Sequence, residues 1–260
     1  MLNLDGGVDE LLESNQCINV WARGHIMLNL QTGEARELNC KSWKCPKHRQ
    51  AWVWRWKKIV SRETAASPVD RLITLTLKST CTPEQLNAAR QYLCRKLRKD
   101  YETFEYLSIL EFTSKTRLPH LHMLARSLFL PQRKLSNYWR EATLHVGISP
   151  SPVVYIEAPR NQEAAAVYAI SYALDGYNKK QDIPAWWRGR KITYSRKFFS
   201  TGTTKAIWMA FLKEEFGPPS GDWVVCEQHK HKAYLPPVSR ETLEIDYEKG
   251  EFYIDSPPGW

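Results

Sequence analysis

Apolar residues recur along the middle of the chain in two rhythms: alternation, which is typical of strands, and a spacing of three to four, which is typical of helices. Two strand-length apolar runs, 106–112 and 118–124, flank the short polar connection 113–117. Runs of this length separated by a few turn-forming residues predict paired antiparallel strands. We therefore expect a β-hairpin over 104–126, the stretch around which the rest of the chain is organised.

The sequence on either side of the hairpin continues the two patterns. It predicts a strand at 71–78, a helix from Pro83, helices at 131–145, 163–177 and 204–216, and a strand at 153–158. The first helix has a clear start signal, because Thr82 can cap it, Pro83 suits the first helical position and Gln85 suits the third. The order β-α-β-β-α-β-α predicts an α+β fold, an antiparallel sheet with helices packed on it, and excludes the strict alternation of a parallel sheet.

The two ends of the chain carry shorter elements. The sequence predicts two strands around a turn at Gly33 within 20–39, a helix at 49–59, and strands at 222–227 and 232–235. We divide the chain into an N-terminal segment 1–66, a core 67–202 and a C-terminal extension 203–260 that ends in an acidic tail.

Composition adds a partner to this picture. The 260 residues are 43% hydrophobic, enough for a real core, and the formal net charge is +9 with a pI of about 9.2. Such a charge favours a polyanionic partner, although a merely soluble basic protein can have the same balance. The basic residues concentrate at 41–62 and 179–197, where aromatic residues are interleaved with them. Rings can stack bases while cations hold phosphates, so we expect contacts with single-stranded DNA.

The candidate DNA contacts are basic residues of these stretches and of the hairpin turn: Lys44, Arg49, Lys57, Lys115, Arg117, Lys179, Arg188, Arg190 and Arg196. The N-terminus lacks a basic segment followed by an apolar one, and no apolar run approaches the length that spans a bilayer. We therefore expect a cytoplasmic protein with no membrane partner, whose six cysteines are thiols or metal ligands rather than disulfides.

A cysteine-rich knuckle precedes the core. Cys40, Cys45 and His48 lie close together, and Cys17 would complete a tetrahedral set of three thiolates and one imidazole of the kind that binds structural zinc. His25 is an alternative fourth ligand, and ordinary reduced cysteines are the alternative interpretation. Because four protein ligands leave no open position, we expect such an ion to support folding and DNA contact rather than catalysis.

The second strand of the hairpin carries His120-Leu121-His122. Residues two apart on a strand share a face, so both imidazoles project the same way, and the hairpin can bring Glu111 alongside them. Two imidazoles and a carboxylate suit a divalent ion such as Mg²⁺ or Mn²⁺, with positions left for water and phosphate. Alternatively, each histidine is an ordinary strand residue with a backbone partner, since an isolated H-x-H is a weak signal.

Two tyrosines of the predicted helix 163–177, Tyr168 and Tyr172, are four residues apart and therefore lie on one helix face. Aromatic residues at this spacing more often pack in a core. Next to a divalent cation, however, a phenol can attack a phosphate, because the ion stabilises both the phenolate and the developing charge. Tyr168 and Tyr172 are therefore the candidate nucleophiles.

Four sequence blocks, in this order, resemble the HUH superfamily of single-strand endonucleases, most closely the rolling-circle replication initiators (Rep proteins) of single-stranded DNA phages, viruses and plasmids. The blocks are RLITLTLK at 71–78, Glu111 with PHLHML at 119–124, YAISY at 168–172, and YSRKFF at 194–199. The knuckle at 40–48 is also similar to the N-terminal knuckle of such initiators. The resemblance covers residues 17–200 and implies an RRM-like, HUH-type sheet.

The resemblance also implies a mechanism. Glu111, His120 and His122 would hold Mg²⁺ or Mn²⁺ against the scissile phosphate of single-stranded DNA at an origin. Tyr168 or Tyr172 would attack, leaving a 5′-phosphotyrosine and a free 3′-OH that primes synthesis, and a later transfer would rejoin the strand.

The chain departs from the family pattern at one position. Ser171 stands where initiators commonly carry lysine, so the choice of nucleophile stays open and includes Tyr177. No G-x-x-x-x-G-K-[ST] motif occurs, so unwinding would need a host helicase and synthesis a host polymerase. The alternatives are an HUH relaxase or tyrosine transposase, and a non-catalytic protein that binds single-stranded nucleic acid.

Overall fold

The structure is a computed structural model, and it describes residues 17, 19, 25–38, 40, 42–45, 47–113, 115–127, 129–149, 153–161, 170, 187, 189–216, 221 and 223–227. The chain forms two compact units: a sheet unit, residues 57–208, and a knuckle unit, residues 1–56 together with 209–260. Helices α3 (Arg49–Ala66) and α7 (Thr204–Phe216) each contribute residues to both units.

The sheet unit is built on five strands: β3 (Arg71–Thr76), β4 (Phe104–Phe112), β5 (Pro119–Ser127), β6 (Val154–Glu157) and β7 (Ile192–Tyr194). They lie in the order β6-β3-β5-β4-β7, and every neighbouring pair is antiparallel. The predicted α+β class with an antiparallel sheet is therefore confirmed, as is the central hairpin, which β4 and β5 form.

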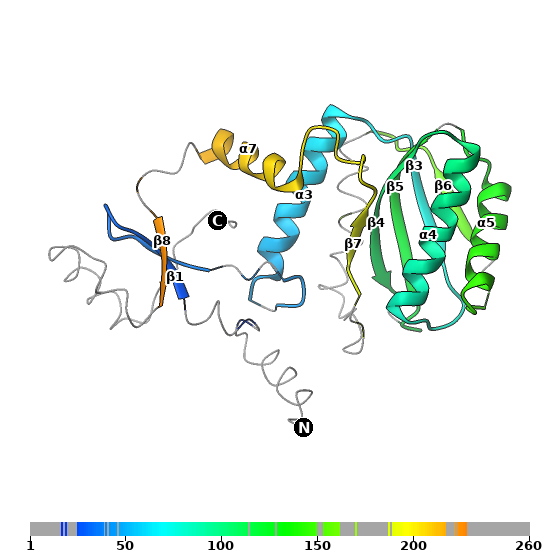
Figure 1. The fold of residues 1–260 in the computed structure, drawn as a ribbon, viewed down its shortest axis with the longest axis horizontal. Helices are drawn as coiled ribbons and strands as arrows, with labels where there is room; N and C mark the ends of the chain where they lie inside the picture. Colours follow the sequence, from blue (N-terminus) through cyan, green and yellow to red (C-terminus); the bar gives the residue numbers. More distant parts are fainter. Residues whose placement is uncertain are drawn as a thin grey trace, which may run out of the picture. The chain divides into compact units, whose positions relative to one another are not determined.

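Helices α4 (Pro83–Asp100) and α5 (Gln132–His145) cover one face of this sheet (Figure 1). Helix α4 begins where the sequence predicts. The Thr82 hydroxyl accepts the backbone N–H of Gln85, and the Gln85 side chain accepts the N–H of Thr82. Helix α5 ends just before Gly147, whose φ of 74° lies in the left-handed region that glycine adopts without strain.

The core lies between these helices and the sheet. Its large, fully buried side chains include Trp139 of α5 and Phe112 of β4. Trp187, from the segment before β7, packs edge-on against Phe112 with ring centroids 5.1 Å apart. The expectation that the aromatic residues of 179–197 stack bases is therefore wrong for Trp187, because its ring is already buried in the core and shields apolar surface from water.

Strand β7 is an element that the sequence does not predict. Its residues pair with β4 in a short ladder, with Ile192 opposite Ile109 and Tyr194 opposite Leu107. Ser195 extends the pairing, since its backbone N–H donates to the carbonyl of Tyr106 and its hydroxyl accepts the N–H of Tyr106, both at 2.9 Å. Three residues are too few to display a strand's alternation, so the sequence pattern gives no signal.

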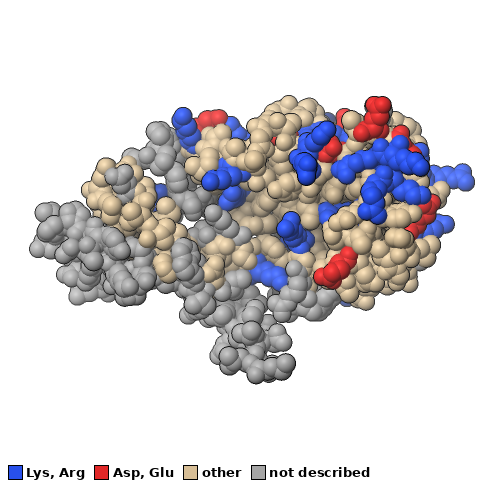
Figure 2. All heavy atoms as spheres, in the orientation of Figure 1, with Lys and Arg blue, Asp and Glu red and all other residues tan. Residues whose placement is uncertain are grey.

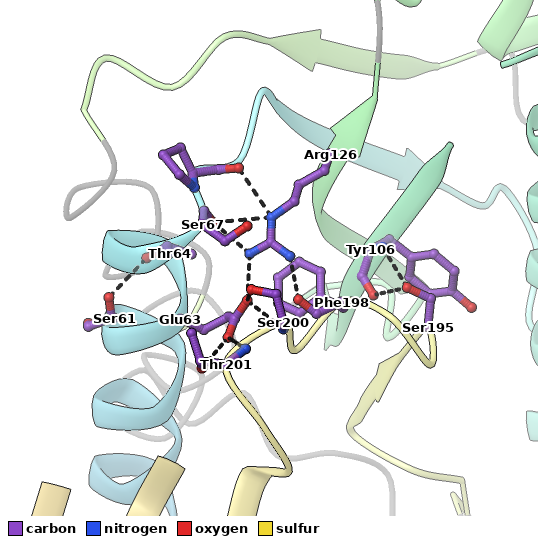
Figure 3. A network of polar contacts seen from close by, with 11 residues as sticks. Ser61, Glu63, Thr64, Ser67, Tyr106, Arg126, Ser195, Phe198, Ser200 and Thr201 are labelled. Atoms are coloured by element: carbon purple, nitrogen blue, oxygen red, sulfur yellow. Dashed lines mark hydrogen bonds and ion pairs between the residues drawn. The ribbon is translucent and has the colours of Figure 1, made fainter. Parts of the chain in front are cut away.

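A network of polar contacts ties the C-terminal end of α3 to β5 and to the loop after β7 (Figure 3). The guanidinium of Arg126 donates to the Glu63 carboxylate at 2.9 Å and to the carbonyl of Phe198, and it lies over the Phe198 ring. The carboxylate also accepts the backbone N–H and hydroxyl groups of Ser200 and Thr201. Glu63 is fully buried, so these donors replace the water that its charge has lost.

The knuckle unit has a second sheet, formed by β1 (His25–Asn29), β2 (Ala35–Glu37) and β8 (Trp223–Glu227) in the antiparallel order β2-β1-β8. The predicted turn at Gly33 joins β1 to β2, with a φ of 73° at the glycine. Within this unit, Trp54 of α3 and Phe211 of α7 pack edge-on at 5.3 Å.

Two predicted elements, the helix at 163–177 and the strand at 232–235, lie outside the described residues, apart from Ile170, which is helical and buried. Within the described part of the chain, no helix is both long enough and apolar enough to cross a membrane.

Candidate functional site

Three side chains that the sequence singles out meet on the sheet face opposite α4 and α5. Glu111 of β4 is directly opposite His120 of β5 in the strand register, and His122 follows two residues later on the same face. One ligand atom from each of the three lies within 4.8 Å of the others. The hairpin therefore brings together the two imidazoles and the carboxylate, and the cluster could hold a divalent cation.

His122 is held at both ring nitrogens. Its Nε2 lies 2.7 Å from Glu111 Oε2, and its Nδ1 lies 3.2 Å from the hydroxyl of Thr74 on β3. When Nδ1–H donates to the hydroxyl, the lone pair of Nε2 faces the carboxylate. Two electron pairs this close require a positive charge between them, which either a proton on Nε2 or a metal ion supplies. The residue is only 8% exposed, so solvent does little to screen that requirement.

His120 is half-buried, and burial lowers the pKa of its imidazole, with the neighbouring His122 acting in the same direction and Glu111 opposing it. Burial disfavours the charged form of a histidine because the imidazolium loses hydration. The neutral ring is the form that binds metal. The environment of His120 therefore favours the ligand form.

Basic residues gather near the cluster at the same end of the sheet. Lys115 and Arg117 are exposed in the turn between β4 and β5, which Thr113 closes by donating its N–H to the carbonyl of Leu118 at 3.0 Å. Arg190 is exposed one residue before Lys191, whose carbonyl accepts the N–H of Leu110, the neighbour of Glu111. Three of the predicted DNA contacts thus lie at the end of the hairpin that carries the cluster.

The other predicted DNA contacts are distributed more widely. Arg196 is exposed after Ser195, which pairs with Tyr106, several residues along β4 from Glu111. Lys57 is half-buried on α3, and Lys44 and Arg49 belong to the knuckle unit, where Arg49 donates to the carbonyl of Trp43 at 2.9 Å. Lys179 and Arg188 lie outside the described residues.

Figure 2 shows Lys and Arg side chains, with some Asp and Glu among them, over the region of α4. On this side of the sheet unit, Lys96 of α4 pairs with Glu141 of α5, and Lys134 of α5 pairs with Asp100 of α4, each at 2.6 Å. These ion pairs neutralise part of the positive charge, so the cations of the hairpin end are better placed to meet a phosphate.

The candidate nucleophiles Tyr168 and Tyr172, and Tyr177 with them, lie outside the described residues. Their role stays a prediction of the sequence.

A second cluster lies in the knuckle unit. One ligand atom from each of Cys17, Cys40, Cys45 and His48 lies within 4.8 Å of the others. His48 Nδ1 is 3.4 Å from the Cys40 Sγ and 3.6 Å from the Cys45 Sγ. His25, the alternative fourth ligand, lies on β1 and is not a member of this cluster.

The electrostatics of the second cluster also favour a cation. Burial raises the pKa of Cys17 and raises that of Cys40 to about 12, with the neighbouring thiols adding to the effect. Burial lowers the pKa of His48, again against the charged form. Buried thiols crowded together resist ionisation until a metal ion compensates the thiolate charge, and the four side chains could hold such an ion.

Two residues of the sheet unit were missed by the sequence analysis. Thr74 contacts His122, and Tyr155 of β6 lies opposite Thr74 on the same sheet face. Thr74 is part of the block RLITLTLK, but only the register between β3 and β5 shows which of its threonines reaches a histidine.

Residues 70–181 match the model of a protein family described as Replication-associated protein ORF2. The matched segment contains Glu111, His120 and His122, and the cysteine cluster lies outside it. The match points to a role in DNA replication and is consistent with a replication initiator. Comparison with curated proteins and with solved structures found no match.

Proposed function

We propose that the chain is a rolling-circle replication initiator that nicks single-stranded DNA at an origin through a tyrosine nucleophile and later rejoins the strand. The observation that carries the proposal is the convergence of Glu111, His120 and His122 on one sheet face, within a segment similar to replication-associated proteins. These three side chains would hold Mg²⁺ or Mn²⁺, because their mixed oxygen and nitrogen donors leave coordination positions for a phosphate.

The topology supports this function. In chain order, β3-α4-β4-β5-α5-β6 is a β-α-β-β-α-β unit, and its strands are arranged β6-β3-β5-β4. We infer from it the RRM-like, HUH-type sheet that the sequence resemblance implies. The central strand β5 carries both histidines, so the cluster lies on the sheet rather than on a loop.

The cleavage step exchanges one phosphate ester for another. The phenolic oxygen of Tyr168 or Tyr172 forms a bond to phosphorus, and the bond from phosphorus to the 3′ oxygen breaks. The phenolic proton passes through solvent to the departing oxygen, which leaves as a 3′-OH. When bound, a divalent ion supplies charge stabilisation to the phosphate and the phenolate.

The 5′-phosphotyrosine retains the energy of the original ester, so a 3′-OH can attack it and rejoin the strand without a further cofactor. In the interval the free 3′-OH would prime a host polymerase, and a host helicase would separate the strands.

We assign the second cluster to structural zinc. Cys17, Cys40, Cys45 and His48 provide the three thiolates and one imidazole of a closed tetrahedral site, which leaves no position for a substrate. Its function would be to stabilise the knuckle unit, where the DNA contacts Lys44 and Arg49 are also found.

The test selects covalent adducts, because the origin sequence is unknown. The full chain is incubated with Mn²⁺ and a random pool of single-stranded oligonucleotides, and adducts that survive detergent are recovered and sequenced. We expect one recurrent sequence, an adduct on a denaturing gel and a released product with a free 3′-OH. The adduct should require Mn²⁺ and should disappear in His122→Ala and in the double variant Tyr168→Phe/Tyr172→Phe.

Tyr92→Phe is the matched control, since this tyrosine lies on α4, on the other side of the sheet, and its loss should leave the adduct unchanged. Binding of single-stranded DNA without any adduct would contradict the nuclease proposal and favour the non-catalytic alternative.

A further inference from the structure

Beside the Glu111–His120–His122 cluster, the sheet carries an exposed aromatic side chain with no assigned role. Tyr155 of β6 is 61% exposed. It lies directly opposite Thr74 of β3, which lies directly opposite His122 of β5. Residues opposite one another in antiparallel strands point to the same face, so Tyr155, Thr74 and His122 form one row across the sheet.

The strand fixes the direction of the Tyr155 side chain. Its neighbour Val154 is buried, and its other neighbour Ile156 packs against the core beneath α4 and α5. Because successive side chains of a strand alternate between faces, Tyr155 must point away from the helices and toward the face of the cluster. Its exposure is therefore a consequence of how β6 is seated in the sheet rather than of a loose end.

The spacing suits an extended single strand of DNA. Adjacent strands lie about 4.8 Å apart, so two steps put the backbone of Tyr155 roughly 10 Å from that of His122. The surface between them is neutral and polar, with the hydroxyl side chains of Thr74 and Thr76 on the intervening strand β3. A nucleotide backbone can cross such a surface without meeting a carboxylate on β3.

We propose that Tyr155 stacks on a base of the single-stranded DNA whose nearby phosphate lies at the Glu111–His120–His122 cluster. The inference rests on the proposed function, because that function supplies the phosphate. A phenol ring on a sheet face offers a flat apolar platform, and bases stack on such rings with little regard to sequence. Lys115, Arg117 and Arg190, at the cluster end of β4 and β5, provide the charge that complements the DNA backbone.

The binding test uses the full chain and a fluorescein-labelled oligonucleotide of twenty thymidines in EDTA, with affinity measured by fluorescence anisotropy. Tyr155→Ala should weaken binding by about 5- to 150-fold, the range for the loss of one base–aromatic stack. Tyr155→Phe and Tyr155→Trp should stay near wild type, because stacking requires the ring and not the hydroxyl. Phe129→Ala is the matched control, since Phe129 is 73% exposed but follows the other end of β5.

A second measurement reports the contact itself. The same oligonucleotide carrying 5-iododeoxyuridine is irradiated in complex with the protein, and the crosslinked peptide is identified by mass spectrometry. We expect a crosslink at residue 155 in the wild type and none there in Tyr155→Ala. Wild-type affinity of Tyr155→Ala, absence of oligonucleotide binding by the wild type, or crosslinks only on other peptides would each overturn the proposal.

The two proposals fail separately. If no covalent adduct forms with Mn²⁺ but binding in EDTA still depends on the ring at residue 155, the nuclease activity fails and the stacking site stands. If adducts form normally and Tyr155→Ala binds like the wild type, the stacking site fails and the nuclease stands.

Discussion

Thr74 decides which tautomer of His122 is favoured. The residues are 48 positions apart in sequence, yet the hydroxyl of Thr74 lies 3.2 Å from Nδ1 of His122. Metal-binding histidines generally donate their second ring N–H to such a partner, which orients the ring and leaves the other nitrogen as the ligand. Thr74 would therefore act through His122 and not on the DNA itself.

Removal of this hydroxyl should weaken metal binding without emptying the cluster of ligands. Thr74→Val keeps the branched shape of the side chain but cannot accept the N–H. We expect its Kd for Mn²⁺ to rise about 10- to 100-fold, the usual cost of losing an outer partner. Isothermal titration calorimetry of the metal-free full chain measures the change.

Thr74→Ser is the matched control for this experiment, since it retains the hydroxyl and should bind Mn²⁺ nearly as tightly as the wild type. Equal affinities of Thr74→Val and wild type would show that the contact does not orient His122.

The convergence of Glu111, His120 and His122 could be predicted from sequence because it depends on local regularities. Side chains two apart on a strand share a face, and a short turn returns the second strand beside the first. The contact between Thr74 and His122 could not, because it depends on the register between β3 and β5. Packing over the whole sheet sets that register, and a shift by one residue would turn Thr74 to the other face.

At the scale of elements, the buried pair of Glu63 and Arg126 fastens α3 to β5 and to the loop after β7. Glu63→Gln removes the negative charge and leaves the guanidinium of Arg126 without its anionic partner. We expect the free energy of unfolding to fall by about 3–5 kcal/mol, the usual result of breaking a buried pair from one side. Urea denaturation followed by circular dichroism measures the loss.

Glu102→Gln is the control for this substitution, because Glu102 is an exposed carboxylate in the connection before β4 and should change stability by less than about 0.5 kcal/mol. A similar effect of the two substitutions would mean that the network contributes little.

The same carboxylate should make stability depend on pH. Burial acts to raise the pKa of Glu63, but hydrogen bonds from Ser200 and Thr201 outweigh it and the pKa is lowered. A lowered pKa in the folded state stabilises the protein above the unfolded-state value of about 4.3. This contribution disappears as the pH falls through the folded value. The wild type should therefore lose stability more steeply than Glu63→Gln when urea midpoints are compared below about pH 4.3.

The cysteine cluster gives a spectroscopic prediction for the knuckle unit. Co²⁺ added to metal-free protein should give the intense visible bands of a tetrahedral thiolate site, and Zn²⁺ should displace it. Cys45→Ser should lose most of this absorbance, because the Cys45 thiol is fully buried within the cluster. His122→Ala should keep it, since His122 belongs to the other unit. A wild-type spectrum without these bands would contradict the zinc assignment.

For the whole molecule, the net charge of +9 should govern affinity for single-stranded DNA through salt. Each phosphate contact contributes about 0.7 to the slope of log K against log salt concentration for single strands. The double variant Lys115→Gln/Arg117→Gln should therefore lower the magnitude of that slope by about 1.4. Anisotropy titrations at several NaCl concentrations give the slope. Arg95→Gln/Lys99→Gln, which removes two exposed cations from α4, should leave it unchanged.

The short strand β7 has a consequence for how the chain can be shortened. It begins at Ile192, after the segment that resembles replication-associated proteins has ended, and it covers the outer edge of β4. A fragment ending at residue 181 would leave the N–H and C=O groups along that edge available to another copy. We expect such a fragment to self-associate through β4, while a fragment that continues through Thr201 keeps the edge closed and the Glu63 carboxylate satisfied.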